Sequence, residues 1–255
     1  MSEVGSPGYT PYQPQLIPVA RGADLWTVEG PEVRYRFAGL QVPCPTRMTV
    51  VRLSDGSLWI HSPVQITPQL ASDLAKIGAV SILIAPNRNH FLPLAQWAGA
   101  YPDAQVFAAP GLSDRTGVPP HDTLSEGLAI PWADEIAHIT FLLGDFTEVV
   151  FFHRKSQTLI VTDLMMNYEA GRICNPLMRL FLKLGGATGP RGNPSIDMRT
   201  ALRPYRSQLE AGLRRAIAYA PEQIILAHGQ CYERDAVAEI GRAFPFVHGI
   251  VGKSG

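Results

Sequence analysis

Two histidines and two aspartates follow short apolar runs of the sequence, one after each run. His90 ends the segment APNRNH, Asp145 follows Leu-Leu-Gly, Asp163 follows Ile-Val-Thr and His228 follows Ile-Leu-Ala. In α/β folds, functional side chains gather at the carboxyl ends of strands. Imidazole and carboxylate groups are also ligands that zinc and iron take in proteins. Two histidines and two aspartates from separate strands could therefore close around a divalent ion.

Apolar runs broken by polar, glycine and proline residues predict the elements that would position these side chains. Two β-type runs at 48–53 and 58–61 flank an Asp-Gly turn, which is typical of a hairpin. From residue 58 to residue 109 strands and helices alternate, the order of an α/β layered fold. The other predicted strands are 80–84, 105–109, 136–143, 148–152, 158–162, 223–227 and a pair within 26–37, and the predicted helices are 67–76, 91–100, 175–184, 196–220 and 236–243. Two strand-rich blocks, each joined to helices, predict two sheets flanked by helices.

The composition excludes several classes of protein. Of the 255 residues 46% are hydrophobic, enough for a substantial core and too many for global disorder. Basic and acidic residues number 22 each, so the basic excess usual in nucleic-acid-binding proteins is missing, and we expect no nucleic-acid partner. Three cysteines without C-x-x-C spacing indicate neither a disulfide framework nor an all-cysteine zinc site. The N-terminus lacks a signal-peptide pattern and no apolar run has the length of a membrane span, which predicts a cytoplasmic protein acting on a small-molecule ligand or substrate.

The chain is expected to form one domain. Residues 1–22 are rich in proline, glycine, tyrosine and glutamine without periodicity, which predicts an extended N-terminal arm. Residues 23–255 show no internal repeat and no linker that would divide them. Within this domain, the segment CNPLMRLFLKL at 174–184 predicts an amphipathic helix packed on a sheet. A lid over the site, or the surface of a homodimer, is the alternative role of this helix.

Four segments of the chain resemble the metallo-β-lactamase superfamily, and more closely a divergent branch of it denoted DUF4336. They are RMTVVRLSDGSLWIHSP, LIAPNRNHFLPL, EVVFFHRKSQTLIVTDL and IILAHGQ. With their connections they span about residues 47–230, which is most of the chain. The resemblance implies a four-layer αββα sandwich with a metal centre at one edge.

The same resemblance implies a metal site that is only partly kept. Of the superfamily's H-x-H-x-D-H motif, this sequence keeps only the last position, as His90. Ala85 and Asn87 stand where the two histidines of the first metal would be, and Asn89 stands in place of the aspartate. The superfamily's bridging aspartate matches Asp163.

Two further positions complete the comparison. The last histidine of the superfamily matches His228, and Asp145 lies nearest to the position of its remaining histidine ligand. We therefore expect a mononuclear centre held by His90, Asp163 and His228 with Asp145 or Asn87, and zinc as the metal in preference to iron or manganese.

The functional expectation is a metal-dependent hydrolase of unknown substrate. A bound metal with an open position makes hydroxide available near neutral pH. In the superfamily the aspartate at the Asn89 position orients and deprotonates that water, and Asn89 cannot accept the proton, so Asp145 is the candidate substitute base. The alternative is a non-catalytic member of the fold that binds a small ligand or partner and holds no metal. His61 is expected either to support a metal ligand or to be structural.

Overall fold

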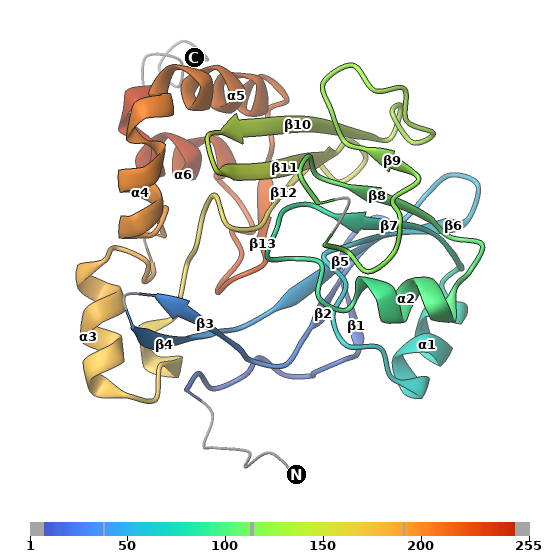
Figure 1. The fold of residues 1–255 in the computed structure, drawn as a ribbon, viewed down its shortest axis with the longest axis horizontal. Helices are drawn as coiled ribbons and strands as arrows, with labels where there is room; N and C mark the ends of the chain where they lie inside the picture. Colours follow the sequence, from blue (N-terminus) through green and yellow to red (C-terminus); the bar gives the residue numbers. More distant parts are fainter. Residues whose placement is uncertain (1–7, 38, 113–114, 191, 248–255) are drawn as a thin grey trace.

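The structure of the protein, a computed structural model, describes residues 8–37, 39–112, 115–190 and 192–247. Its strands form two large sheets that face each other, with helices on the outer sides (Figure 1). The strands of the larger sheet lie side by side in the order β1 (Pro18–Gly22), β2 (Leu25–Glu29), β5 (Arg47–Arg52), β6 (Ser57–His61), β7 (Ala79–Ala85), β8 (Gln105–Ala108) and β9 (Asp122–Thr123). The smaller sheet consists of β10 (Ile136–Leu143), β11 (Phe146–His153), β12 (Thr158–Val161) and β13 (Gln223–Leu226), in that order. This is the predicted αββα arrangement.

The outer helices pack through the apolar residues that their periodicity places on one face. Thr67 caps α1 (Pro68–Ala75), as predicted, because its side-chain oxygen accepts the Leu70 N–H at 3.2 Å. Leu70 and Leu74 of α1, with Leu94 and Trp97 of α2 (Leu94–Ala100), are buried against the larger sheet. Helices α5 (Arg206–Ala218) and α6 (Ala236–Ala243) cover the smaller sheet in the same way.

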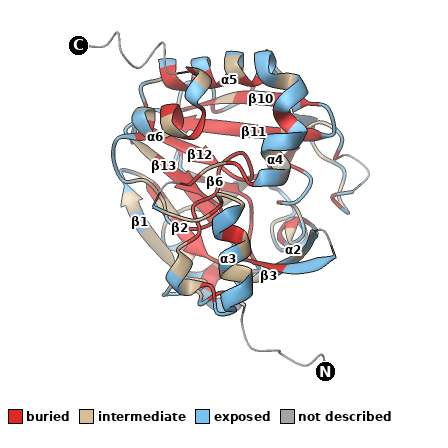
Figure 2. Cartoon of the chain, turned by 90° about the vertical axis from the view of Figure 1, so that its left-hand side faces the viewer, coloured by how far each residue is buried: buried red, intermediate tan, exposed pale blue. Residues whose placement is uncertain are grey.

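The alternation of side chains along β11 divides the core into two layers. Val149 and Phe151 point into the space between the sheets, where they join the cluster that contains Trp59. Val150 and Phe152 point the other way, into the cluster beneath α5 and α6. Because successive side chains of a strand leave opposite faces, a strand buried on both sides has a continuous apolar sequence. Figure 2 shows this strand buried over most of its length.

The amino-terminal segments differ from the predicted ones. Part of the predicted arm enters the fold, since β1 is the edge strand of the larger sheet and pairs with β2. Two strands are present within 26–37 as predicted, but their predicted pairing with each other is wrong, because β2 pairs with β1 and β5 instead. Strand β3 (Val33–Phe37) forms a separate two-stranded ribbon with β4 (Leu40–Cys44).

The predicted helix at 196–220 is interrupted. It consists of α4 (Ile196–Leu202), the 3₁₀ turn η2 (Arg203–Tyr205) and α5. Pro204 lies at the interruption and has no backbone N–H to continue an α-helical ladder. The predicted helix at 175–184 is present as α3 (Pro176–Leu184), which follows the 3₁₀ turn η1 (Ala170–Arg172). None of the helices in the described ranges has the length and apolarity needed to cross a bilayer.

Strand direction brings distant parts of the chain to one edge of the molecule. β6 and β7 are parallel neighbours in the larger sheet, and β12 and β13 are parallel neighbours in the smaller one. The two sheets are joined beyond the end of β7, where the Val149 N–H donates to the Pro86 carbonyl at 2.9 Å. The residues after β7, β12 and β13 therefore meet at the same place.

Candidate metal centre

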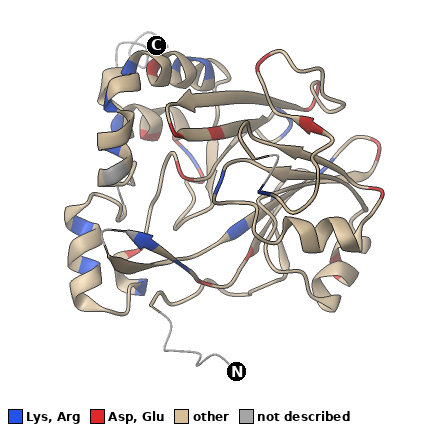
Figure 3. Cartoon of the chain, in the orientation of Figure 1, with Lys and Arg blue, Asp and Glu red and all other residues tan. Residues whose placement is uncertain are grey.

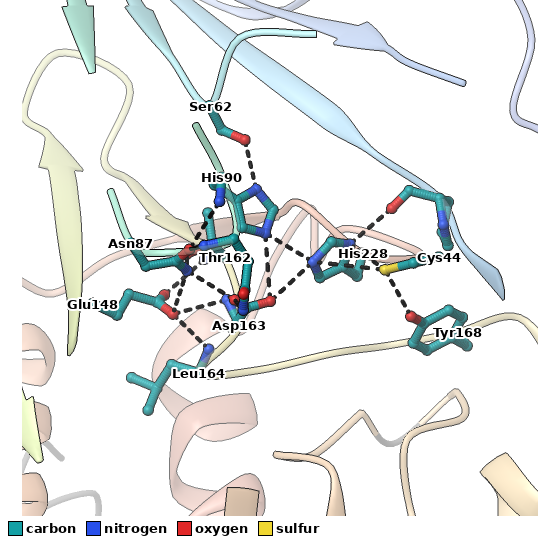
Figure 4. Close-up of polar contacts among 12 residues, drawn as sticks. Cys44, Ser62, Asn87, His90, Glu148, Thr162, Asp163, Leu164, Tyr168 and His228 are labelled. Atoms are coloured by element: carbon teal, nitrogen blue, oxygen red, sulfur yellow. Dashed lines mark hydrogen bonds and ion pairs between the residues drawn. The ribbon is translucent and has the colours of Figure 1, made fainter. Parts of the chain in front are cut away.

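Three predicted ligands converge at this edge. The Nε2 atoms of His90 and His228 lie 3.0 Å apart, and Asp163 Oδ1 lies 3.4 Å from the first and 3.0 Å from the second. Figure 4 shows the two imidazole rings and the carboxylate turned toward one another. Side chains from three loops reach this point because each follows a strand whose carboxyl end lies there. Among the described histidine, cysteine, aspartate and glutamate side chains, these form the group with metal-binding geometry.

The spacing of the three atoms fits a tetrahedral ion. In a tetrahedral zinc site with ligand atoms about 2.0–2.2 Å from the metal, neighbouring ligand atoms lie about 3.3–3.6 Å apart. The observed separations of 3.0 to 3.4 Å are close to those of one face of such a tetrahedron. The donor set, two imidazoles and one carboxylate, is also one that zinc takes in catalytic sites. The residues present therefore fit one divalent ion.

His228 is held in the tautomer that a metal ligand needs. Its Nδ1 lies 2.7 Å from the Pro45 carbonyl oxygen, which can only accept a hydrogen bond. The Nδ1 therefore carries the proton, and in the neutral ring the lone pair is on Nε2, facing His90 and Asp163. Burial lowers the pKa of His228, but Cys44 and Asp163 outweigh burial and place this pKa well above its usual value. His228 Nε2 therefore lies where a cation is favoured, and a proton and a metal ion would compete for it.

Arg47 fixes the backbone on both sides of His228. This buried arginine pairs with Glu29 at 2.6 Å and donates to the carbonyls of Leu226 and Gly229, on either side of the histidine. Gly229 has φ +94°, and a Cβ there would lie 2.0 Å from a backbone oxygen of the neighbouring segment. Gly229 is therefore required by the close approach of two chain segments, directly beside the candidate ligand His228.

His90 is oriented by two neighbours. Its Nδ1 lies 2.7 Å from Ser62 Oγ, the residue that follows β6. Its backbone N–H donates to Asn87 Oδ1 at 3.0 Å, and the Asn89 N–H donates to the same oxygen at 2.8 Å. These contacts leave His90 Nε2 directed at Asp163, and burial lowers the pKa of this imidazole despite the nearby carboxylate. Its neutral form, the one that ligates metals, is favoured.

Two amides hold the Asp163 carboxylate in place. Asn87 and Asn89 each donate a side-chain N–H to Oδ2, at 2.9 and 2.8 Å, so Oδ1 is left to face the imidazoles. Burial would raise the pKa of Asp163, but His90 and His228 hold it well below the usual value. Asp163 is therefore a buried anion whose charge the imidazoles balance, and a bound cation could take over that role.

Glu148 supports this arrangement from behind and was missed by the sequence analysis. The side chain is fully buried on β11 and its oxygens accept three consecutive backbone N–H groups, those of Thr162, Asp163 and Leu164, at 2.8–2.9 Å. Burial and the nearby Asp163 raise the pKa of Glu148 to about 7. A lone glutamate among the apolar residues of a strand was the available signal. Its position fixes the turn that presents Asp163.

The other predicted site residues lie apart from this centre or at its margin. Asp145 is exposed in the two-residue turn between β10 and β11, and the structure does not bring it to the cluster. The turn is tight because Gly144 has φ +68°, and it packs against Tyr205. Asn89 is exposed next to buried Asp163, so it marks the solvent side of the centre. His61 is buried and stacks on Trp59, with neither ring nitrogen hydrogen-bonded.

Comparisons with known proteins agree with this fold. The family model described as "Domain of unknown function (DUF4336)" matches residues 24–174, and no curated protein matches the chain. Among solved structures, the DIM-1 metallo-β-lactamase exposed to ceftazidime is 14% identical at a TM-score of 0.57, covering 92% of this chain and 98% of that one. A metallo-β-lactamase from Hirschia baltica is 13% identical at a TM-score of 0.55, covering 88% of this chain and 94% of that one.

A flavodiiron protein has the same fold. The metal-soaked Flv1 flavodiiron core from Synechocystis sp. PCC6803 is 13% identical at a TM-score of 0.60, covering 95% of this chain and 62% of that one. At such low identities these likenesses establish the fold alone. The predicted metallo-β-lactamase fold is confirmed.

Proposed function

Since the chain belongs to the DUF4336 family and has the metallo-β-lactamase fold, we propose that it is a metal-dependent hydrolase with a mononuclear centre. His90, Asp163 and His228 would hold the ion. The observation that carries this proposal is the convergence of their three ligand atoms, which lie 3.0 to 3.4 Å apart. The Pro45 carbonyl also fixes the tautomer of His228 that leaves Nε2 free to bind the ion. A divalent ion there would supply a Lewis acid for a carbonyl or phosphoryl group and would lower the pKa of water.

One metal is proposed, because the residues in place of a first-site histidine pair have no free ligand atom. Ala85 has no ligand atom in its side chain, and Asn87 uses both atoms of its amide in hydrogen bonds. The Asn87 oxygen accepts two backbone N–H groups, and its nitrogen donates to Thr162 and Asp163. With Asp145 in an exposed turn, three protein ligands remain. A three-ligand site with an open position is the arrangement that catalytic zinc uses.

Metal content tests the proposal directly. We expect about one zinc per chain in the wild type after loading under reducing conditions, and almost none in the double variant His90→Ala/His228→Ala, because removal of two of three ligands leaves no chelate. Elemental analysis measures this. The matched control is His121→Ala/His138→Ala, which removes two histidines outside the cluster and should retain the metal. A wild type without metal would contradict the proposal and favour a ligand-binding role.

Hydrolysis is then tested on a panel of esters, lactones, thioesters and phosphodiesters. The proposal expects turnover that a chelator abolishes and that zinc restores, with the His90→Ala/His228→Ala variant inactive at equal protein concentration. Activity that survives in this variant would separate hydrolysis from the metal centre.

Asn89 provides a second test of the centre. We expect Asn89→Asp to reduce the free energy of unfolding of the metal-free protein by about 1–2 kcal/mol, because it replaces an N–H···O contact of 2.8 Å by two like charges. Zinc should then raise the melting temperature of this variant more than that of the wild type. Thermal unfolding with and without zinc measures both effects. Equal zinc-induced shifts in the two proteins would show that Asn89 does not face the ion.

A further inference from the structure

Helix α3 presents leucines to solvent on one side. Leu177, Leu180 and Leu184 are 78%, 53% and 74% exposed, and their spacing of three and four residues places them in one stripe. The opposite side packs inward through Met178 and Leu182. Asn175 caps the helix by accepting the N–H groups of the second and third helical residues. The leucine stripe is therefore displayed by a well-anchored helix.

The stripe continues onto α4. Ile196, at the start of α4, is 48% exposed and lies beside the end of α3, where a Cβ on Gly185 would be 3.8 Å from its side chain. Figure 2 views the molecule from this side and shows exposed residues along both helices. We define the α3–α4 face as Leu177, Leu180, Leu184 and Ile196 with the basic residues that flank them.

The flanking residues are strongly basic. Between residues 172 and 206 the only acidic residue of the sequence is Asp197, against the basic residues Arg172, Arg179, Lys183, Arg191, Arg199, Arg203 and Arg206. Lys183 lies next to the leucine stripe on α3, and Arg203 follows Ile196 at a spacing of seven residues. Both are exposed, and neither makes an ion pair with a described carboxylate. Seven of the 22 basic residues of the sequence lie in this segment, and Figure 3 shows Lys and Arg along α3 and α4.

We infer that the α3–α4 face docks the protein on an anionic lipid bilayer. Exposed leucines beside lysine and arginine are the composition of helices that lie in a membrane interface, where apolar side chains enter the acyl region and cations meet lipid phosphates. The charge also selects this partner over a second copy of the chain. A two-fold dimer through this face would bring the same basic residues of both copies together, and like charges oppose that contact.

Vesicle flotation tests this inference on the full chain. We expect the protein to float with phosphatidylserine–phosphatidylcholine vesicles at low salt, to stay behind with phosphatidylcholine alone, and to be released as salt screens the charges. Lys183→Gln/Arg203→Gln should weaken vesicle binding about 30-fold, since each cation near an anionic surface contributes about fivefold. Leu177→Gln/Leu184→Gln should weaken it by at least about tenfold.

Matched control substitutions distinguish an effect of the α3–α4 face from a general effect of losing exposed leucines or cations. Leu92→Gln/Leu142→Gln changes two leucines that are as exposed (71% and 58%) but lie elsewhere, and Arg115→Gln/Arg234→Gln removes two exposed cations elsewhere. Both controls should bind vesicles like the wild type. No flotation with anionic vesicles at low salt would overturn the inference. So would a wild-type dimer by light scattering that Leu177→Gln/Leu184→Gln converts to a monomer, because the face would then be a homodimer interface. Neither readout depends on metal or turnover.

Discussion

Replacing Glu148 by alanine should reduce the free energy of unfolding by roughly 3–5 kcal/mol, a large part of the stability of a typical domain. The carboxylate is fully buried and accepts the N–H groups of Thr162, Asp163 and Leu164. Alanine leaves all three donors without an acceptor, and each unsatisfied buried N–H costs about 1–3 kcal/mol. Removal of a costly buried charge offsets part of this loss. Denaturant unfolding of the metal-free protein measures the difference.

If the alanine variant does not fold, the variant Glu148→Gln gives a second test, through its stability and its zinc binding. Glu148→Gln keeps one acceptor oxygen and should lose roughly half as much stability. Because Glu148 fixes the backbone that presents Asp163, the glutamine variant should also bind zinc at least about tenfold more weakly. Glu135→Ala is the control: Glu135 also accepts a backbone N–H, from Ser54, but near the surface, and its loss should stay below about 1 kcal/mol. Equal losses for Glu148→Ala and Glu135→Ala would contradict the supporting role.

The sequence predicts well those features that depend on local order. The helix after Thr67 and the hairpin around the Asp-Gly turn are specified by residues within a few positions of each other, and both are present. The break at Pro204 was equally local and could have been predicted, because proline interrupts a helix wherever it falls in the interior. Strand partners are not local. Whether β2 pairs with β3 or with β5 is decided by burial of whole faces, which the sequence of one strand does not contain.

The same distinction applies to the candidate centre. His90, Asp163 and His228 each follow a strand, and the rule that functional groups gather at carboxyl ends grouped them together with Asp145. The resemblance to the metallo-β-lactamase superfamily then singled out the three as ligands. Asp145 also follows a strand, but β10 runs antiparallel to β11 and turns back at once, so its end is a hairpin rather than part of the site. Sequence position alone did not separate these two cases.

The partners of the supporting residues could not be predicted from the sequence. Glu148 stands out among apolar residues of its strand, but the Asp163 N–H that it accepts 15 residues away, and the Pro45 carbonyl that holds His228 across 183 residues, are backbone groups without a residue-type signal. A backbone carbonyl that fixes an imidazole tautomer is the same for any residue at position 45. Such contacts become visible only when the two sheets are placed together.

A second large effect is expected at acidic pH. The free energy of unfolding of the wild type should fall as the pH falls, and replacement of His61 by phenylalanine should remove much of this loss. His61 is buried between Trp59 and Phe151, and neither of its ring nitrogens has a hydrogen-bond partner in the described structure. Burial first, and the neighbouring His90 second, lower the pKa of His61 to about 3. The folded protein therefore keeps this imidazole neutral at a pH where the unfolded chain protonates it.

The sign of the effect follows from this difference in proton uptake. The pKa of His61 is lower in the folded state than the 6.5 of an exposed histidine, so its contribution is fully present above pH 6.5 and is lost as the pH falls toward 3. The slope is about 1.4 kcal/mol per pH unit, which gives roughly 3 kcal/mol between pH 7 and pH 4. The phenyl ring of His61→Phe fits the aromatic stack and does not titrate. The free energy of unfolding of this variant should therefore fall between pH 7 and pH 4 by roughly 3 kcal/mol less than that of the wild type.

Denaturant unfolding across this pH range isolates the contribution of His61, because other buried histidines titrate in both proteins and cancel in the difference. His138→Phe is the control, since His138 is partly exposed and donates to the Ser125 carbonyl through its ring nitrogen. Its pH profile should follow that of the wild type. If His61→Phe and the wild type lost stability in parallel down to pH 4, the imidazole of His61 would have to be protonated in the fold. A proton acceptor, such as an ordered water between the two sheets, would then be required beside Trp59, and the core at the end of β6 would be polar rather than dry.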